Sequence, residues 1–214
     1  MRYLFFIVLF LFSFNVALAD CKTCKNIAII STGGTIVSKY NPKLKGEVAT
    51  LTGEELLGAI PQIKKIANIK KVIEVSKIDS SDMSPEIWLK LAKTVDSVNN
   101  DPKIDGILIL HGTDTLEDTS YFINLLITPK KPIVFTGSMR SASEKDSDGP
   151  RNIKDSLVTI SSKRVDKSVV MVVMNGKIMS AYAVKKVNTS NVDAFSPGYF
   201  GLMGIVDDLT INMA

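Results

Sequence analysis

Short apolar runs alternate with longer amphipathic stretches along this chain. The runs occupy residues 26–31, 72–78, 107–110, 133–136 and 169–174. Apolar runs of this length, bounded by small polar residues, are typical of strands buried in a parallel sheet. The last run ends at Asn175-Gly176, a dipeptide that favours tight turns, so we expect a hairpin into residues 178–186.

The stretches between these runs carry the start signals of helices. Thr52–Glu55 has the spacing of a capping box, and Ser84 followed by Pro85 places an N-cap before a first-turn proline. Residues 117–127 and 152–162 are two further helix candidates. Strands that alternate with helices predict an α/β fold of the flavodoxin or Rossmann kind. We expect three layers, with helices on both faces of a mostly parallel sheet plus a β-hairpin, and a ligand crevice beyond the carboxyl ends of the strands.

Residues 1–19 have the features of a secretory signal peptide. Arg2 gives a positive start, residues 4–12 are an unbroken apolar run, and Ala17–Ala19 fits an A-x-A cleavage site. A retained membrane anchor is the alternative, although the apolar run is short for a bilayer span. We therefore expect a periplasmic or secreted protein that has no membrane contact after cleavage.

Both cysteines lie in the short segment 20–25, before the first predicted strand. Export permits a disulfide between Cys21 and Cys24, whereas this position lacks the strand-to-helix setting of a redox active site. A zinc site would need two further ligands, and His111 is the only histidine of the chain. We expect a local disulfide or free thiols here, and no metal.

The charge of the chain does not indicate a nucleic-acid partner. The sequence has 26 Lys+Arg against 22 Asp+Glu, which gives a formal net charge of +4. The basic residues are scattered and form no block that would follow a phosphate backbone. With 45% hydrophobic residues, the chain has the composition of a globular protein.

Hydroxyl groups follow two of the predicted strands at positions suited to nucleophilic catalysis. Thr35 comes after Gly33 and Gly34, whose lack of a side chain lets a ligand approach the backbone closely. Thr113 stands beside Asp114 at the end of another strand. For Thr35 an ordinary turn threonine is the alternative.

A hydroxyl nucleophile needs a neighbouring group that accepts its proton. Lys185 and Lys186, beyond the expected hairpin turn, are candidates, and a solvated basic pair is the alternative. A Ser-His-Asp mechanism would have to use His111, which precedes Gly112 at a strand end without any G-x-S-x-G segment in the chain. We therefore assign His111 a structural hydrogen bond.

Five segments of the chain stand in the order of the motif series of bacterial L-asparaginases, and the match extends over most of the sequence. They are Thr32–Ile36 (TGGTI), Asp79–Met83 (DSSDM), His111–Thr115 (HGTDT), Gly137–Arg140 (GSMR) with Asp148–Pro150 (DGP), and Lys186–Thr189 (KVNT). The first and third resemble the two signature motifs of that family. With its signal peptide the chain resembles the exported, type II branch, although the second segment is more similar to the cytoplasmic branch.

The resemblance implies hydrolysis of L-asparagine, and weakly of L-glutamine, to the amino acid and ammonia through a threonine acyl-enzyme. It makes Thr35 the primary nucleophile and Thr113, Asp114 and Lys186 its supporting triad. Tyr40 stands near the place of the family's lid tyrosine, but closer to Thr35.

The same resemblance implies a set of substrate contacts. Ser80 matches the residue that binds the α-carboxylate, Asp114 also holds the α-amino group, and Ser81 stands where many exported members carry glutamine or glutamate. Gly34 and Gly112 line the same site, where the backbone stabilises the developing oxyanion. The resemblance implies no metal and no organic cofactor.

The resemblance also suggests domain limits and partners. Residues 26–205 would form the catalytic domain and residues 206–214 the start of a linker, because family members continue into a smaller C-terminal domain that completes a neighbouring subunit's site and builds a homotetramer. We expect reduced activity if that part is missing. A catalytically silent relative that binds small amino acids is one alternative, and a cytoplasmic amidotransferase subunit with this domain is another, which the signal peptide opposes.

Overall fold

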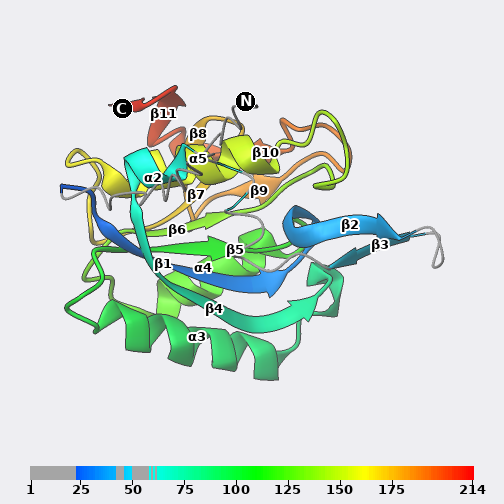
Figure 1. Cartoon of the computed structure of the whole chain (residues 1–214), viewed down its shortest axis with the longest axis horizontal. Helices are drawn as coiled ribbons and strands as arrows, with labels where there is room; N and C mark the ends of the chain where they lie inside the picture. The colour runs from blue at the N-terminus through cyan, green and yellow to red at the C-terminus, as the bar shows by residue number, and fades with distance from the viewer. Residues whose placement is uncertain (1–22, 42–45, 50–57, 59, 61) are drawn as a thin grey trace, which may run out of the picture.

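An eight-stranded sheet forms the centre of the computed structural model, which describes residues 23–41, 46–49, 58, 60 and 62–214 (Figure 1). The strand order is β12-β11-β8-β7-β6-β5-β1-β4. In chain order these strands are β1 (Asn26–Gly33), β4 (Asn68–Ile78), β5 (Gly106–Leu110), β6 (Ile133–Thr136), β7 (Val170–Met174), β8 (Lys177–Ser180), β11 (Gly204–Asp207) and β12 (Thr210–Met213).

The strands from β4 to β7 in this order run parallel. β1 lies between β4 and β5, so the chain adds strands first on one side of β1 and then on the other. This is the flavodoxin-like order, in which the reversal next to the first strand opens a crevice at the carboxyl ends. The predicted mostly parallel α/β fold is confirmed, and the crevice is expected beside the ends of β1 and β5.

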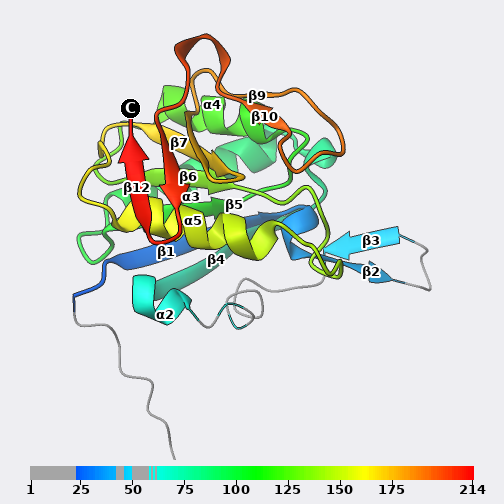
Figure 2. The same ribbon diagram turned by 90° about the horizontal axis from the view of Figure 1, so that it is seen from above.

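Helices cover both faces of the sheet, as Figure 2 shows from above. They are α2 (Ile63–Ile66) and α5 (Gly149–Ser161) on one face and α3 (Pro85–Asn99) and α4 (Leu116–Leu126) on the other. The helix α3 begins where the sequence predicts, with the Ser84 hydroxyl accepting a hydrogen bond from the Ile87 amide. The helix α5 begins at Gly149 rather than at Asn152, because Pro150 fits the first turn of a helix.

Alternate residues of the central strands fill two separate cores. Along β1, Ala28 and Ile30 pack in the core under α3 and α4, whereas Ile27 and Ile29 pack in the core under α2 and α5. All of these side chains are fully buried. A strand that buries both of its faces carries an unbroken apolar run, as residues 27–30 do here. This run is the pattern from which the sequence predicted β1.

β7 and β8 form the predicted hairpin. Asn175 and Gly176 have φ values of 49° and 74°, in the left-handed region that a two-residue turn of type I′ requires. The second arm is shorter than expected, because β8 ends at Ser180. Residues 185–186 instead form the short strand β9, which pairs with β10 (Phe195–Ser196) outside the main sheet.

Residues 204–213 extend the main sheet, although the sequence led us to expect the start of a linker at residue 206. β11 pairs antiparallel with both β8 and β12. Val206 and Ile211 are buried while their neighbours along the strands are largely exposed. Because every second residue is polar or exposed and a turn at Asp208 interrupts the segment, it forms no apolar run in the sequence.

A two-stranded arm leaves the sheet just after β1 and projects beyond the carboxyl ends of the parallel strands (Figures 1 and 2). Its strands are β2 (Ser38–Asn41) and β3 (Gly46–Ala49), which follow the 3-10 helix η1 (Thr35–Val37). Tyr40 lies on β2, opposite Glu47 in the backbone register. The 3-10 helix that leads into the arm therefore begins at Thr35, the nucleophile that the sequence predicts.

Several expectations concern segments outside the described residues. These are the signal peptide at residues 1–19 and the capping box at Thr52–Glu55. Cys24 is disulfide-bonded, so the free-thiol alternative is wrong for this cysteine, whereas Cys21 lies outside the described residues. Among the described helices, none is long and apolar enough to cross a membrane.

Candidate active site

The carboxyl ends of β1, β4 and β5 come together so closely that side chains are excluded between them. Gly34 has a φ of 82°, and its amide donates a hydrogen bond of 2.9 Å to the Ile78 carbonyl at the end of β4. A Cβ on Gly34 would lie 2.3 Å from the Gly112 Cα, and one on Gly112 would lie 2.5 Å from the Ser80 Oγ. Only glycine fits at these two positions, so the backbone itself forms the floor of the predicted crevice.

Both candidate threonines follow this glycine contact directly. Thr35 comes after Gly34 and begins η1, where it is half-buried, and Thr113 comes after Gly112 and is buried. Because Gly34 and Gly112 lie against each other, the fold brings the segments of the two threonines to one place. The sequence predicted this from motif order alone, and the strand arrangement supplies the physical reason.

Lys186 reaches the second threonine from a distant part of the chain. Its Nζ lies 2.9 Å from the Thr113 Oγ1 and 2.6 Å from the Asp114 Oδ1. The Lys186 side chain is 14% exposed, whereas that of Asp114 is 58% exposed and opens toward solvent. Lys185 turns the other way and pairs with Glu117 at 3.1 Å. Of the two candidate lysines, the structure therefore brings only Lys186 to Thr113 and Asp114.

Ser80 links the turn after β4 to the turn after β5. It lies in the 3-10 helix η2 (Ser80–Asp82), is buried, and its Oγ accepts a hydrogen bond of 3.1 Å from the Asp114 amide. Its carbonyl accepts a second bond, of 2.8 Å, from the Thr115 hydroxyl. Ser81 is exposed and donates its hydroxyl hydrogen to Asp79, so it does not share these contacts.

A family model described as asparaginase, N-terminal, matches residues 26–214, a range that contains every residue of this site. The chain belongs to the asparaginase family. Three relatives show how close the likeness is. The probable periplasmic L-asparaginase of Haemophilus influenzae is 36% identical over 94% of this chain, and L-asparaginase 2 of Escherichia coli is 39% identical over 87% of it. A crystal structure of the probable cytoplasmic L-asparaginase of Campylobacter jejuni matches 89% of the chain with a TM-score of 0.80 and 39% identity.

The length of these relatives limits what the likeness says about activity. The chain spans 58%, 53% and 57% of the three proteins, respectively, or about half of their length. The chain thus has the family and the fold of these relatives. Their activity, in contrast, is that of longer proteins.

His111 forms a hydrogen bond next to the candidate site. It is fully buried at the end of β5, and its Nδ1 lies 2.7 Å from the Gly112 carbonyl, which makes Nδ1 the donor in that bond. Burial lowers the pKa of His111 to about 4, so the imidazole is neutral at neutral pH. The hydrogen bond fixes the Gly112 carbonyl next to Thr113, in keeping with the structural hydrogen bond predicted for this histidine.

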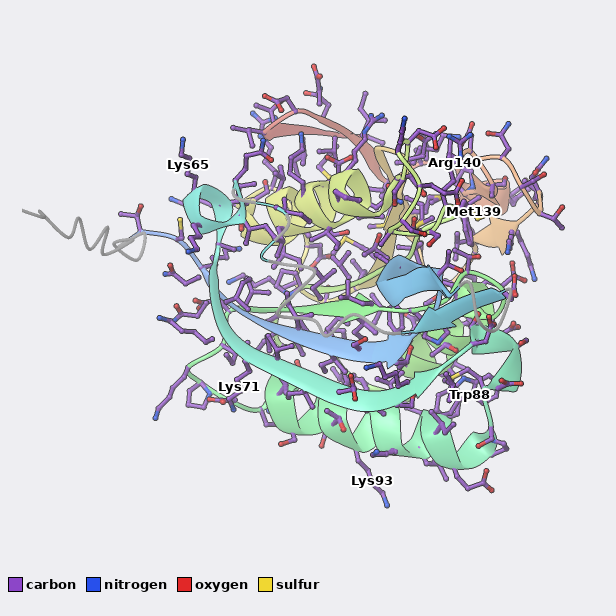
Figure 3. The ribbon with its side chains drawn as sticks, turned by 45° about the vertical axis from the view of Figure 1, so that its right-hand side comes forward. Lys65, Lys71, Trp88, Lys93, Met139 and Arg140 are labelled. Carbon is purple, nitrogen blue, oxygen red and sulfur yellow. The ribbon has the colours of Figure 1, made fainter. Side chains whose placement is uncertain are left out.

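Asp148 anchors a loop beside the site, although in the sequence it was placed in a motif without being assigned a role. It accepts hydrogen bonds from the Ser138 hydroxyl and from the backbone amides of Met139 and Arg140, and a further one of 2.9 Å from the Asn152 side chain. Figure 3 shows Met139 and Arg140 at the end of the molecule from which the β2–β3 arm projects. The signal for this role was the aspartate immediately before Gly149-Pro150, where a loop meets a helix.

Two further residues complete the account of the predicted site. The backbone of Tyr40 lies on β2, in the arm that follows Thr35 and η1. Glu117, which no sequence pattern singled out, lies in the first turn of α4 and binds both Lys185 and the Lys186 backbone amide. The structure thus joins Thr113, Asp114, Lys186 and Ser80 by hydrogen bonds and places Gly34 against Gly112, whereas Ser81 pairs elsewhere. The carboxylate of Glu117, which joins two of these segments, was missed.

Proposed function

We propose that this chain is an amidohydrolase that converts L-asparagine to L-aspartate and ammonia through a covalent threonine intermediate. The observation that carries the proposal is the hydrogen-bond chain in which the Lys186 Nζ contacts both Thr113 and Asp114. A lysine held between a buried hydroxyl and a carboxylate has the parts that relay protons to and from an oxygen nucleophile, and Thr35 follows the glycine that packs against Gly112. The names of the relatives agree with this reaction.

In the first stage, the Thr35 hydroxyl oxygen attacks the side-chain amide carbon of the substrate. The proton of Thr35 passes to the amide nitrogen, and the carbon–nitrogen bond breaks. Ammonia is released, and the substrate acyl group remains bound to Thr35 as an ester. The negative charge that develops on the amide oxygen lies near the backbone around Thr113, where fixed dipoles stabilise it. The close approach of Gly34 and Gly112 allows substrate to reach that backbone.

In the second stage, water attacks the ester carbon and the bond to Thr35 breaks. One proton of the water returns to the Thr35 oxygen, and aspartate is released. The chain formed by Thr113, Lys186 and Asp114 relays protons in both stages, since its members are already within hydrogen-bond distance. Asp114, which is exposed, also faces the α-amino group of the substrate, and the Ser80 hydroxyl donates to the α-carboxylate.

We further propose that L-glutamine is a poorer substrate. Relatives named glutaminase-asparaginase are 33% and 34% identical to the chain, so both substrates occur among its relatives. Asparagine and glutamine differ by one methylene, which a pocket discriminates by about 1–3 kcal/mol. The short Ser81 side chain is bound to Asp79 and does not extend toward Thr113.

Export of the chain is also part of the proposal. The apolar segment at residues 1–19 with its A-x-A site supports it, as does the name of the periplasmic relative from H. influenzae. The solved relative from C. jejuni is named cytoplasmic, which favours the other location. N-terminal sequencing of the protein from a cell-envelope fraction decides between them, since export predicts a chain that begins at Asp20.

Ammonia release from L-asparagine by the purified chain tests the proposed reaction. Thr35→Ala and Lys186→Ala are expected to lower kcat at least about 100-fold, because each removes a group that the chemical steps require. Thr210→Ala and Lys185→Ala are matched controls: both residues are exposed, and neither contacts Thr113. The controls are expected to keep kcat within about twofold of the wild type.

Three outcomes of this experiment lead to different conclusions. Activity that disappears in both site variants and persists in both controls supports the proposal. Equal activity in all five proteins would mean a contaminating enzyme. A folded wild type that shows no turnover, but binds aspartate saturably in calorimetry, would replace the proposed enzyme with a silent amino-acid-binding relative.

A further inference from the structure

Lys186 depends on contacts outside the main sheet for its position. It lies on β9, a strand of two residues that pairs with Phe195 and Ser196 of β10, and the next residue, Val187, donates one backbone hydrogen bond of 2.8 Å to the Ala194 carbonyl. A two-residue strand provides few hydrogen bonds, so this pairing alone defines the backbone of Lys186 weakly. Nevertheless, its Nζ has to meet Thr113, which is carried by the turn after β5.

The carboxylate of Glu117 connects these two parts of the molecule. One oxygen accepts a hydrogen bond of 2.5 Å from the Lys186 backbone amide, and the other lies 3.1 Å from the Lys185 Nζ. The Glu117 side chain is 19% exposed, whereas that of Lys185 is 67% exposed. The ion pair with Lys185 therefore belongs to the exposed kind that contributes little, and the bond to the backbone of Lys186 is the more protected contact.

Glu117 lies only a few residues after Thr113 and Asp114 in the chain. Thr113 and Asp114 end the turn that leads into α4, and Glu117 lies in the first turn of that helix. The same short segment thus carries all three groups that bind Lys186. The Thr113 hydroxyl and the Asp114 carboxylate contact its Nζ, and the Glu117 carboxylate accepts a hydrogen bond from its backbone amide. The positive end of the helix dipole favours a negative charge at this place.

We propose that Glu117 is a positioning residue for the amidohydrolase reaction, which holds the backbone of Lys186 so that its Nζ stays against Thr113. This inference rests on the proposed function. Glu117 does not touch the substrate and exchanges no proton with it. Without the Glu117 carboxylate, residues 185–186 lose their hydrogen bonds to α4. The backbone that carries the long Lys186 side chain is then no longer held in one position. The proton relay then weakens while the substrate contacts of Ser80 remain.

Kinetics of four variants test the positioning role. Glu117→Ala is expected to lower kcat by about 10- to 100-fold with KM within about threefold, because proton-transfer groups contribute to the chemical step rather than to binding. Glu117→Gln keeps an oxygen that accepts the Lys186 amide, so we expect it to restore most of kcat. Lys185→Ala removes only the exposed ion pair, and Asp118→Ala removes a neighbouring first-turn charge. Both are expected to stay within about twofold of the wild type.

Crystal structures of the wild type and Glu117→Ala give a second readout that does not depend on turnover. The proposal expects the Lys186 Nζ to lie beyond hydrogen-bond distance of the Thr113 Oγ1 in the variant. An unchanged distance, a kcat equal to the wild type, or an equal loss in Glu117→Ala and Glu117→Gln would each overturn it. An inactive wild type would instead refute the proposed function, and the two distances would still decide whether Glu117 positions Lys186.

Discussion

His111, the only histidine of the chain, lies fully buried between the end of β5 and the ring of Phe135. The folded protein keeps this side chain neutral, because burial lowers its pKa from 6.5 to about 4. In the unfolded chain the same imidazole takes up a proton near its ordinary pKa. The two states therefore bind different numbers of protons between pH 6.5 and about 4, and the unfolded state binds more.

This difference predicts how stability depends on pH. Since the unfolded state binds more protons, the free energy of unfolding rises with pH in this window. The contribution of His111 is fully present above pH 6.5 and is lost as the pH falls toward 4. We expect a loss of about 2 kcal/mol between pH 7 and pH 5. Urea denaturation of the wild type and of His111→Gln at both pH values would measure it.

The single histidine also allows a direct check. Its ring-proton resonance is expected to titrate near pH 4 in NMR spectra of the folded protein. A midpoint near 6.5, or the same pH slope in the wild type and in His111→Gln, would contradict the prediction.

The sequence predicted the kinds of residue in the site better than their partners. Thr35, Thr113 and Asp114 were recognised because they follow strand ends in short motifs. Spacing alone left Lys185 and Lys186 equivalent, since adjacent residues of a strand point to opposite sides, and only the resemblance to the family's motifs singled out Lys186. Their partner Glu117 was missed, because a contact across 69 positions leaves no local pattern.

At the scale of elements, Asp148 ties the loop after β6 to the start of α5. The loop residues Ser138, Met139 and Arg140 all donate to this one carboxylate, as does Asn152 in the first turns of the helix. Hydrogen bonds to a charged group are stronger than neutral ones, and removing the acceptor leaves several donors without a partner. The anchor therefore stabilises a loop that would otherwise have little structure of its own.

We expect Asp148→Ala to lower the free energy of unfolding by about 2–3 kcal/mol, because the half-buried donors lose a charged acceptor. The midpoint and slope of urea denaturation measure this change. Asp146→Ala is the matched control, since Asp146 is exposed and pairs only with the Arg140 side chain among the described residues. A similar loss in both variants would show that the loop as a whole, rather than Asp148, is sensitive to substitution.

The fully buried strands were predicted more accurately from the sequence than the partly exposed ones. The parallel strands bury both faces and therefore read as apolar runs, which placed β1, β5 and β6 within a few residues of their observed ends. β12 forms the edge of the sheet with β11 next to it, and both alternate buried with exposed residues, so the same search passed over them. Edge strands of this kind need pairing information that the local sequence does not contain.

Across the whole molecule, one group of aromatic side chains is unusually exposed. Tyr121, Tyr182, Phe200 and Tyr199 contact one another in series, with ring centroids 5.8 to 5.9 Å apart. Tyr199 is 99% exposed and Phe200 is 69% exposed. Contiguous apolar surface of this kind favours association in water, because covering it removes hydrophobic area from solvent.

We therefore expect the purified chain to self-associate through this aromatic group at micromolar concentrations. Replacing Tyr199 and Phe200 together by serine is expected to raise the dissociation constant about tenfold or more, as measured by sedimentation equilibrium. Leu209→Ser serves as the control, since Leu209 is exposed elsewhere, at the turn between β11 and β12. A monomer at every concentration, or an equal effect of the control, would contradict the prediction.

The hydrogen bond between Lys186 and Thr113 joins residues 73 positions apart. Between them the chain forms α4, β6, α5, β7 and β8, so the two side chains meet only after these segments have docked. Closing long stretches of chain to build a parallel sheet is slow compared with forming helices. We therefore expect a refolding chain to regain its helical content before it regains the contact between Lys186 and Thr113.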